Sequence, residues 1–111
     1  MPQIIQSHFV GNWRILEMDA WDAGYFDMEE PVHITIRENL SGEFQFGLVQ
    51  GDIDGRVETV NGVPRFDFSW SGFDENDPAI GRGWLCADGN NGEGHIFIHM
   101  GDDSGLKAVR E

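Results

Sequence analysis

The sequence predicts an all-β protein, built as an eight-stranded antiparallel up-and-down (meander) barrel. Apolar and polar residues alternate with a period of two in many short segments, as half-buried strands require. Turn-forming residues interrupt this alternation at intervals of about ten residues. No segment carries a convincing helical pattern, although 20–30 has room for one turn of helix. An open two-sheet sandwich is the alternative, but only a closed barrel removes the exposed strand edges.

The 111 residues fit a single domain, 1–111, with no linker or repeat. Asn61-Gly62 is the strongest hairpin signal, because both residues accept positive φ. Further turns are expected over 39–42, which Ser41-Gly42 ends, at Gly51-Asp52 and over 88–93, and loops over 19–30, 71–78 and 101–104. The eight expected strands cover residues of about 8–18, 31–38, 43–50, 53–60, 63–70, 79–87, 94–100 and 105–110.

The period of two also predicts which side chains point into the barrel. In the strand over 79–87 the pattern is ambiguous. The large apolar area of Trp84 favours the face that holds Ile80, Arg82, Trp84 and Cys86 as the inward one. For the other strands the expected inward residues are Phe9, Gly11, Trp13, Ile15, Val32, Ile34, Ile36, Phe44, Phe46, Leu48, Ile53, Gly55, Val57, Phe66, Phe68, Trp70, Ile96, Ile98 and Met100.

Gly11-x-Trp13 opens the first expected strand, and Arg110 ends the last one. This pattern resembles the calycin superfamily of lipocalins, fatty-acid-binding proteins and avidins, and small bacterial proteins of that type. The resemblance implies that Trp13 plugs one end of the barrel and that Arg110 covers it by cation–π stacking. It also implies a barrel able to hold one small ligand. The motifs that bind biotin in avidins are not apparent, and neither biotin nor fatty-acid binding is carried over.

The chain is strongly acidic, with 20 acidic against 7 basic residues and a net charge of −13. Such a charge repels nucleic acids and anionic membrane surfaces, so neither is an expected partner. A cation, a basic protein or an amine-bearing ligand is favoured instead. The N-terminus lacks the basic and apolar regions of a signal peptide, and no stretch is long enough to span a membrane. A cytoplasmic protein is therefore expected.

In a meander, the loops alternate between the two ends of the barrel. The end opposite Trp13 receives both long loops, with the aromatic residues Trp21, Tyr25, Phe26 and Phe73. It also receives 12 of the 20 acidic residues, which are Asp19, Asp22, Asp27, Glu29, Glu30, Asp52, Asp54, Asp74, Glu75, Asp77, Asp102 and Asp103. This end is the expected functional one. The competing interpretation is that acidic residues simply favour loops and that the aromatic residues form a lid.

The sequence carries no recognisable catalytic pattern, and an enzyme is not expected. It contains no G-x-S-x-G, P-loop or G-x-G-x-x-G motif. The acidic run from Asp74 lacks the Gly and Glu of an EF-hand, and on one strand His95 and His99 stand about 13 Å apart, too far to share an ion. Cys86 has no neighbouring His and is interpreted as inert. No metal and no cofactor is therefore expected.

Two hypotheses remain. The first is a small-molecule binding module whose mouth is lined by Trp70, Arg82 and Trp84, beneath the loops that carry Trp21, Tyr25, Phe26 and Phe73. The second is a protein-interaction module with a filled barrel, which binds through its acidic rim or as a homodimer. An eight-stranded barrel is compatible with either, because its interior is just wide enough for side chains or for one small ligand.

Overall fold

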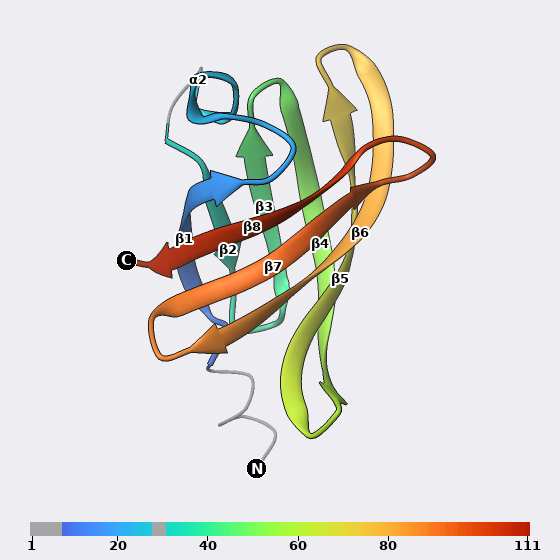
Figure 1. Cartoon of the computed structure of the whole chain (residues 1–111). Coiled ribbons are helices and arrows are strands. Elements are labelled where there is room, and N and C mark those ends of the chain that lie inside the picture. Colours follow the sequence, from blue (N-terminus) through green and yellow to red (C-terminus); the bar gives the residue numbers. More distant parts are fainter. Residues whose placement is uncertain (1–7, 28–30) are drawn as a thin grey trace.

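The computed structural model describes residues 8–27 and 31–111, which form a closed antiparallel barrel (Figure 1). The strands follow one another around the barrel in chain order, and β8 pairs with β1 to close it. The predicted fold class is therefore confirmed. The elements are β1 (Gly11–Met18), the short helix α2 (Ala23–Phe26), β2 (His33–Ile36), β3 (Ser41–Phe46), β4 (Val49–Val60), β5 (Val63–Asp74), β6 (Asp77–Asp88), β7 (Asn91–Ile98) and β8 (Asp103–Arg110).

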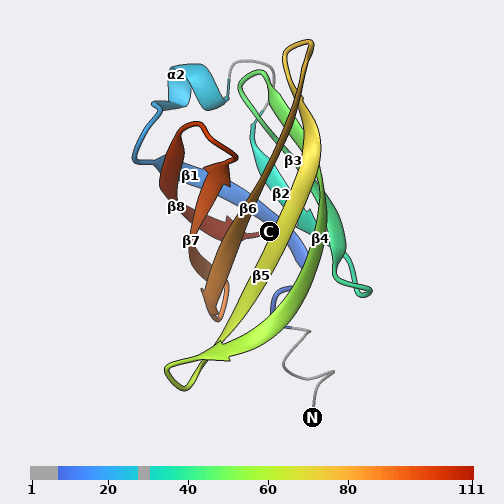
Figure 2. The same ribbon diagram turned by 90° about the vertical axis from the view of Figure 1, so that its right-hand side faces the viewer.

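The strands differ greatly in length, and this gives the barrel its shape. β4, β5 and β6 have 12 residues each, whereas the others have between 4 and 8. The β4–β5 and β5–β6 hairpins therefore project beyond the barrel at opposite ends (Figures 1 and 2). No helix among the described residues has the length and apolar character needed to cross a membrane.

Several predicted boundaries were wrong because the long strands continue through expected turns. Gly51 and Asp52 lie within β4, and the chain turns earlier, at Gly47-Leu48, where Gly47 has a φ of +56°. The expected loop over 71–78 is instead the paired ends of β5 and β6. Met100 was expected to point inward but is 95 % exposed, because it lies in the β7–β8 turn with a φ of +58°.

The predicted orientation of β6 was also wrong. Gly83 and Leu85 are buried, whereas Arg82 is exposed and Trp84 is half-buried on the outer surface. The interior explains this choice, because the Phe68 ring occupies the space that a side chain on residue 83 would need. The orientation of β6 is thus set by the space that Gly83 leaves for the Phe68 ring, and not by the apolar area that Trp84 could bury. The inward sets predicted for β1, β2 and β5 are confirmed.

The closed end of the barrel is built around Trp13, which is fully buried. The guanidinium carbon of Arg110 lies 4.8 Å from the centre of the Trp13 ring, and the two residues are paired across β1 and β8. Arg110 also donates hydrogen bonds to the carbonyls of His8, Val10 and Gly89. The predicted stacking is therefore confirmed, and Arg110 ties β8 both to the segment before β1 and to the β6–β7 turn.

Replacing Arg110 with Ala should lower the free energy of unfolding by roughly 2–3 kcal/mol, because one cation–π contact and several charged hydrogen bonds are lost together. Urea denaturation followed by tryptophan fluorescence measures this change. Arg37→Ala is the matched control, since it also removes one guanidinium but only from an exposed ion pair with Glu43. The control should change stability by less than about 1 kcal/mol, and equal losses would contradict the role of Arg110.

Candidate functional site

The interior of the barrel is filled by aromatic rings that lie over inward-facing glycines. A Cβ on Gly51 would come within 2.7 Å of the Trp70 ring and 3.0 Å of the Phe44 ring. The same close approach pairs Gly55 with Phe66, Gly83 with Phe68, Gly81 with Trp70 and Gly92 with Trp13. The rings also contact one another, for example Phe44 and Trp70 at 5.1 Å between ring centres. In the described structure, the space that a bound ligand would need is thus occupied by side chains.

The end expected to be open is covered by the segment around α2. The Trp21 ring lies 5.0 Å from the Phe46 ring and 6.1 Å from the Tyr25 ring, and both residues pack against the core. Tyr25 covers Gly47, and its hydroxyl accepts a 3.5 Å hydrogen bond from the Leu48 amide. Trp21 and Tyr25 therefore form a lid, as in the competing interpretation of this end. The side chain of Phe26 lies outside the described part of the structure.

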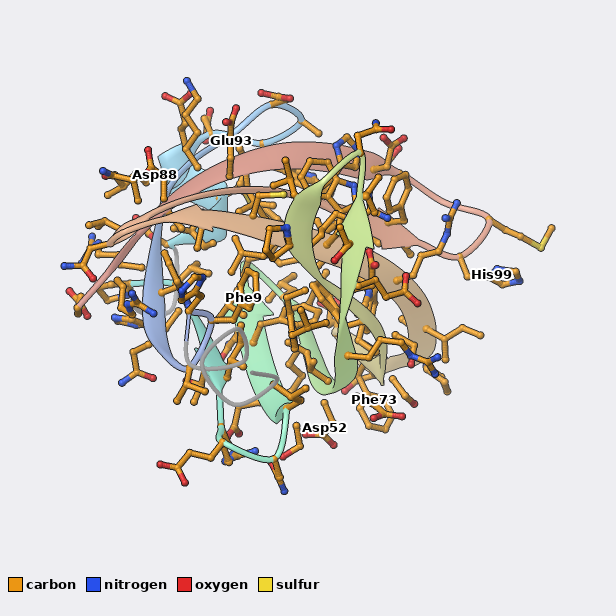
Figure 3. The ribbon with its side chains drawn as sticks, turned by 90° about the horizontal axis from the view of Figure 1, so that it is seen from below. Phe9, Asp52, Phe73, Asp88, Glu93 and His99 are labelled. Atoms are coloured by element: carbon orange, nitrogen blue, oxygen red, sulfur yellow. The ribbon has the colours of Figure 1, made fainter. Side chains whose placement is uncertain are left out.

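The residues expected to line the mouth are not brought together. Trp70 is 3 % exposed inside the barrel, where its Nε1 donates a 3.2 Å hydrogen bond to the Phe97 carbonyl. Arg82 and Trp84 lie on the other side of the barrel wall. Phe73 is 45 % exposed on β5 near the β5–β6 turn. Figure 3 looks along the barrel from below and shows Phe9 inside it, with Phe73 at its periphery.

On the outer surface, Arg82 and Trp84 belong to a row of five side chains that crosses β5, β6 and β7, which we call the outer belt: Arg65, Trp84, His95, Phe97 and Arg82. Neighbours in the belt lie 5.4, 6.4, 4.5 and 4.5 Å apart, measured between ring centres or from a ring centre to a guanidinium carbon. The register explains the row, because Trp84 pairs with His95 and Arg82 pairs with Phe97.

Four of the five residues of the outer belt, all except His95, line a groove with a volume of about 330 Å³, at the lower end of the range for small-molecule sites. The groove crosses β4 to β7 and is lined by Asp54, Gly55, Arg56, Glu58, Arg65, Asp67, Phe68, Ser69, Arg82, Gly83, Trp84 and Phe97. Three of the seven basic residues of the chain gather there with three carboxylates. The groove is therefore nearly neutral on a protein with a net charge of −13.

Charged side chains in the groove retain binding capacity, and Arg82 and Asp67 lie beside Trp84. Arg82 is exposed and stacks on Phe97, and it forms no ion pair with any described residue. Asp67 lies beside Trp84 in the sheet, and its Oδ1 is 2.8 Å from Nε of Arg65. The contact lacks hydrogen-bond geometry, because Nε of Arg65 and the other oxygen of Asp67, Oδ2, are both buried without a hydrogen-bond partner in the described structure. The Arg65–Asp67 pair is therefore only partly hydrogen-bonded, and the N–H group of a ligand would give the Asp67 carboxylate a further donor.

The described acidic residues of the expected functional end are spread over four regions. Asp19, Asp22 and Asp27 lie around α2, Asp52 and Asp54 lie in β4, Asp74 and Asp77 flank the β5–β6 turn, and Asp103 begins β8. Glu29 and Glu30 lie outside the described residues. Asp103 instead supports the outer belt, since its Oδ2 is 2.6 Å from Nε2 of His95. Within residues 8–27 and 31–111, no three His, Cys, Asp or Glu side chains converge to hold a metal ion.

Comparisons with protein-family models, with curated proteins and with solved structures gave no match to this chain. The groove must therefore be judged by its own chemistry.

Asp67, His95 and Phe97 were missed as candidates in the sequence. Each lies on the polar face of an alternating strand, where an ordinary surface residue is expected. The alternation did predict that the side chains of four residues point to the outer surface of β5 and β7: Arg65, Asp67, His95 and Phe97. It did not predict that these side chains are neighbours. The groove became visible only when the register placed these positions side by side.

Gly51→Ala should lower stability by about 1–3 kcal/mol, because the new methyl group would overpack against Trp70 and Phe44. Adding Phe44→Leu should recover part of this loss by making room. Thermal unfolding followed by circular dichroism measures both effects, and the exposed Ser71→Ala serves as the neutral control. An interior with spare volume would absorb the Gly51 methyl group without loss.

Cys86 lies at the margin of the belt, opposite Glu93 in the sheet. Burial raises the pKa of its thiol, the Arg65 charge lowers it, and the Asp67 and Glu93 charges raise it further. Because only the thiolate reacts, alkylation by iodoacetamide should reach its half-maximal rate at a higher pH than for an unburied cysteine. Glu93→Gln should shift this midpoint downward, and Glu43→Gln on the far side of the barrel should not. Equal profiles for the three proteins would contradict the assignment.

Proposed function

We propose that this protein is a small-molecule binding module whose site is the groove on the outer face of β4 to β7. The ligand would be a small zwitterion with a carboxylate, an amine and a flat apolar part. The observation that carries the proposal is the placement of Arg82 and Asp67 beside Trp84. Arg82 forms no ion pair with a described residue, and the Asp67 carboxylate, although paired with Arg65, is only partly hydrogen-bonded in the described structure. This placement keeps the functional class expected from the sequence but moves the site from the barrel mouth to the outer wall.

Arg82 would hold the carboxylate. Its guanidinium presents a planar set of donors that suits a bidentate carboxylate, and stacking on Phe97 restricts its position before the ligand arrives. The exposed hydroxyl of Ser69 is next to Arg82 in the β5–β6 register and adds a neutral polar group to the groove. The net −13 charge outside the groove would work against a purely anionic ligand, which favours a zwitterion.

Asp67 would hold the amine through its carboxylate, which Arg65 satisfies only in part, in a charge-assisted hydrogen bond. Trp84 lies directly across from Asp67 on β5 and two residues from Arg82 along β6. Its half-buried indole offers a flat surface for the apolar part of the ligand, because aromatic faces pack well against other rings.

Three probes with the same ring separate these roles: tryptophan, indole-3-acetate and tryptamine. Titration followed by amide chemical shifts should show tryptophan binding with shifts in β5, β6 and β7. Arg82→Ala should weaken tryptophan and indole-3-acetate about tenfold, which corresponds to about 1.4 kcal/mol, and leave tryptamine unchanged. Asp67→Asn should weaken tryptophan and tryptamine by a similar factor and leave indole-3-acetate unchanged.

Arg37→Ala is the control for net charge, because Arg37 pairs with Glu43 away from the groove. It should change none of the three affinities. Shifts confined to Trp21 and Tyr25 would place the binding at the lid and overturn the groove as the site. Binding of none of the probes at millimolar concentration would overturn the proposed ligand class.

A second candidate function, protein interaction, is supported by a different surface. Phe73, Ile80 and Met100 are large apolar side chains, respectively 45, 53 and 95 % exposed, near the β5–β6 and β7–β8 turns. Asp74, Glu75, Asp77 and Asp102 lie in or beside the same turns. Exposed apolar groups among like charges suit a partner with a basic, partly apolar surface. The filled barrel is the interior expected under this hypothesis and supports it over a ligand site inside the barrel.

A further inference from the structure

The long hairpins leave three strand segments without a neighbour on one side among the described residues. β4 pairs with β3 only through Val49–Asp54, and the Gly55 amide then donates to the Leu40 carbonyl. Beyond that point, no described residue pairs with the other edge of β4 as far as Val60. The start of β5 precedes its first pairing with β6 at Phe66. The start of β6 precedes its first pairing with β7 at Gly81.

Proline protects two of these three edges. In an antiparallel ladder, main-chain N–H and C=O groups point alternately toward one neighbour and then the other. The two-residue turns Asn61-Gly62 and Glu75-Asn76 fix this alternation. It places the main-chain nitrogens of Pro64 and Pro78 on the strand edge that faces away from the hairpin partner. A proline there removes the only donor that a new strand would use, a common protection against edge-to-edge association.

The third edge, Gly55–Val60 of β4, has no proline. The alternation places the N–H and C=O of Val57 and Thr59 on the side away from β5, consistent with the Gly55 bond to Leu40 on that same side. This segment therefore presents an available main-chain ladder on a hairpin that projects from the barrel (Figure 2). Such an edge is a template for another strand.

We propose that the Gly55–Val60 edge of β4 pairs with the same edge of a second copy of this chain, antiparallel about a two-fold axis at Val57. In that register Arg56 faces Glu58 of the other copy, and Glu58 faces its Arg56. Both side chains are exposed, and neither forms an ion pair with a described residue. A two-fold interface requires self-complementarity, which this short segment has. A shift of the axis by one residue, to Glu58, would place the two Glu58 side chains opposite each other, so the charges fix the register.

The charge pattern gives a sharp test by sedimentation velocity over micromolar to millimolar concentrations. The wild type should form a reversible dimer. Arg56→Glu and Glu58→Arg should each weaken dimerisation at least tenfold, because like charges then face each other. The double variant R56E/E58R should restore it, and an equimolar mixture of the two single variants should form a heterodimer. Within one chain, the double variant places a carboxylate at position 56 opposite Asp67 and a guanidinium at position 58 opposite Arg65, so both pairs carry like charges. Restored dimerisation would therefore come from the contact between the two copies.

Thr59→Pro tests the main-chain ladder separately. The N–H of Thr59 points away from β5, so its loss breaks no hydrogen bond of the β4–β5 hairpin. The variant should fold with the wild-type circular dichroism spectrum and remain monomeric. A wild type that stays monomeric at millimolar concentration would overturn the proposal. A dimer that persists in Arg56→Glu and Thr59→Pro would place the interface elsewhere and overturn it too. So would a dimer that forms only after removal of residues 1–7, since that segment would then be the occupant of the edge.

Discussion

The contact between aromatic rings and inward-facing glycines is the constraint on which the rest of this structure depends. An eight-stranded barrel has an interior only wide enough for side chains or for one small ligand. Here Trp70, Phe68 and Phe66 occupy it, and Gly51, Gly83 and Gly55 supply the room for them. Any side chain at those glycines would compete with a ring. The filled interior therefore moves the capacity for binding to the outer wall.

The same constraint sets the orientation of β6 and so creates the outer belt. Because residues 81 and 83 must be glycines facing inward, Arg82 and Trp84 face outward. There they meet Arg65 of β5 and the His95 and Phe97 of β7. The groove beside this belt is nearly neutral on an otherwise acidic protein. Core packing and the candidate site are thus two consequences of one alternation of small and large residues.

The two hairpins that project from the barrel have different chemistry, which separates two kinds of association. The β5–β6 hairpin carries acidic residues and the exposed Phe73 and Ile80, and Pro78 blocks its edge. The β4–β5 hairpin carries alternating charges, with Pro64 on its β5 side and no proline on its β4 side. Ligand binding at the groove and pairing at the β4 edge involve adjacent surfaces, because Arg56 and Glu58 also line the groove.

The sequence by itself determined the number of strands, the closed meander and most of the inward faces, because alternation and turn residues are local signals. The stacking of Arg110 on Trp13 was implied by a family resemblance and not by these local signals, and the structure contains it. Tertiary structure decided what local signals leave open. The turn at Gly47-Leu48, the continuation of β5 to Asp74 and the outward Trp84 depend on which rings share the interior. The groove depends on register, since Asp67, Trp84 and His95 become neighbours only when three strands are aligned.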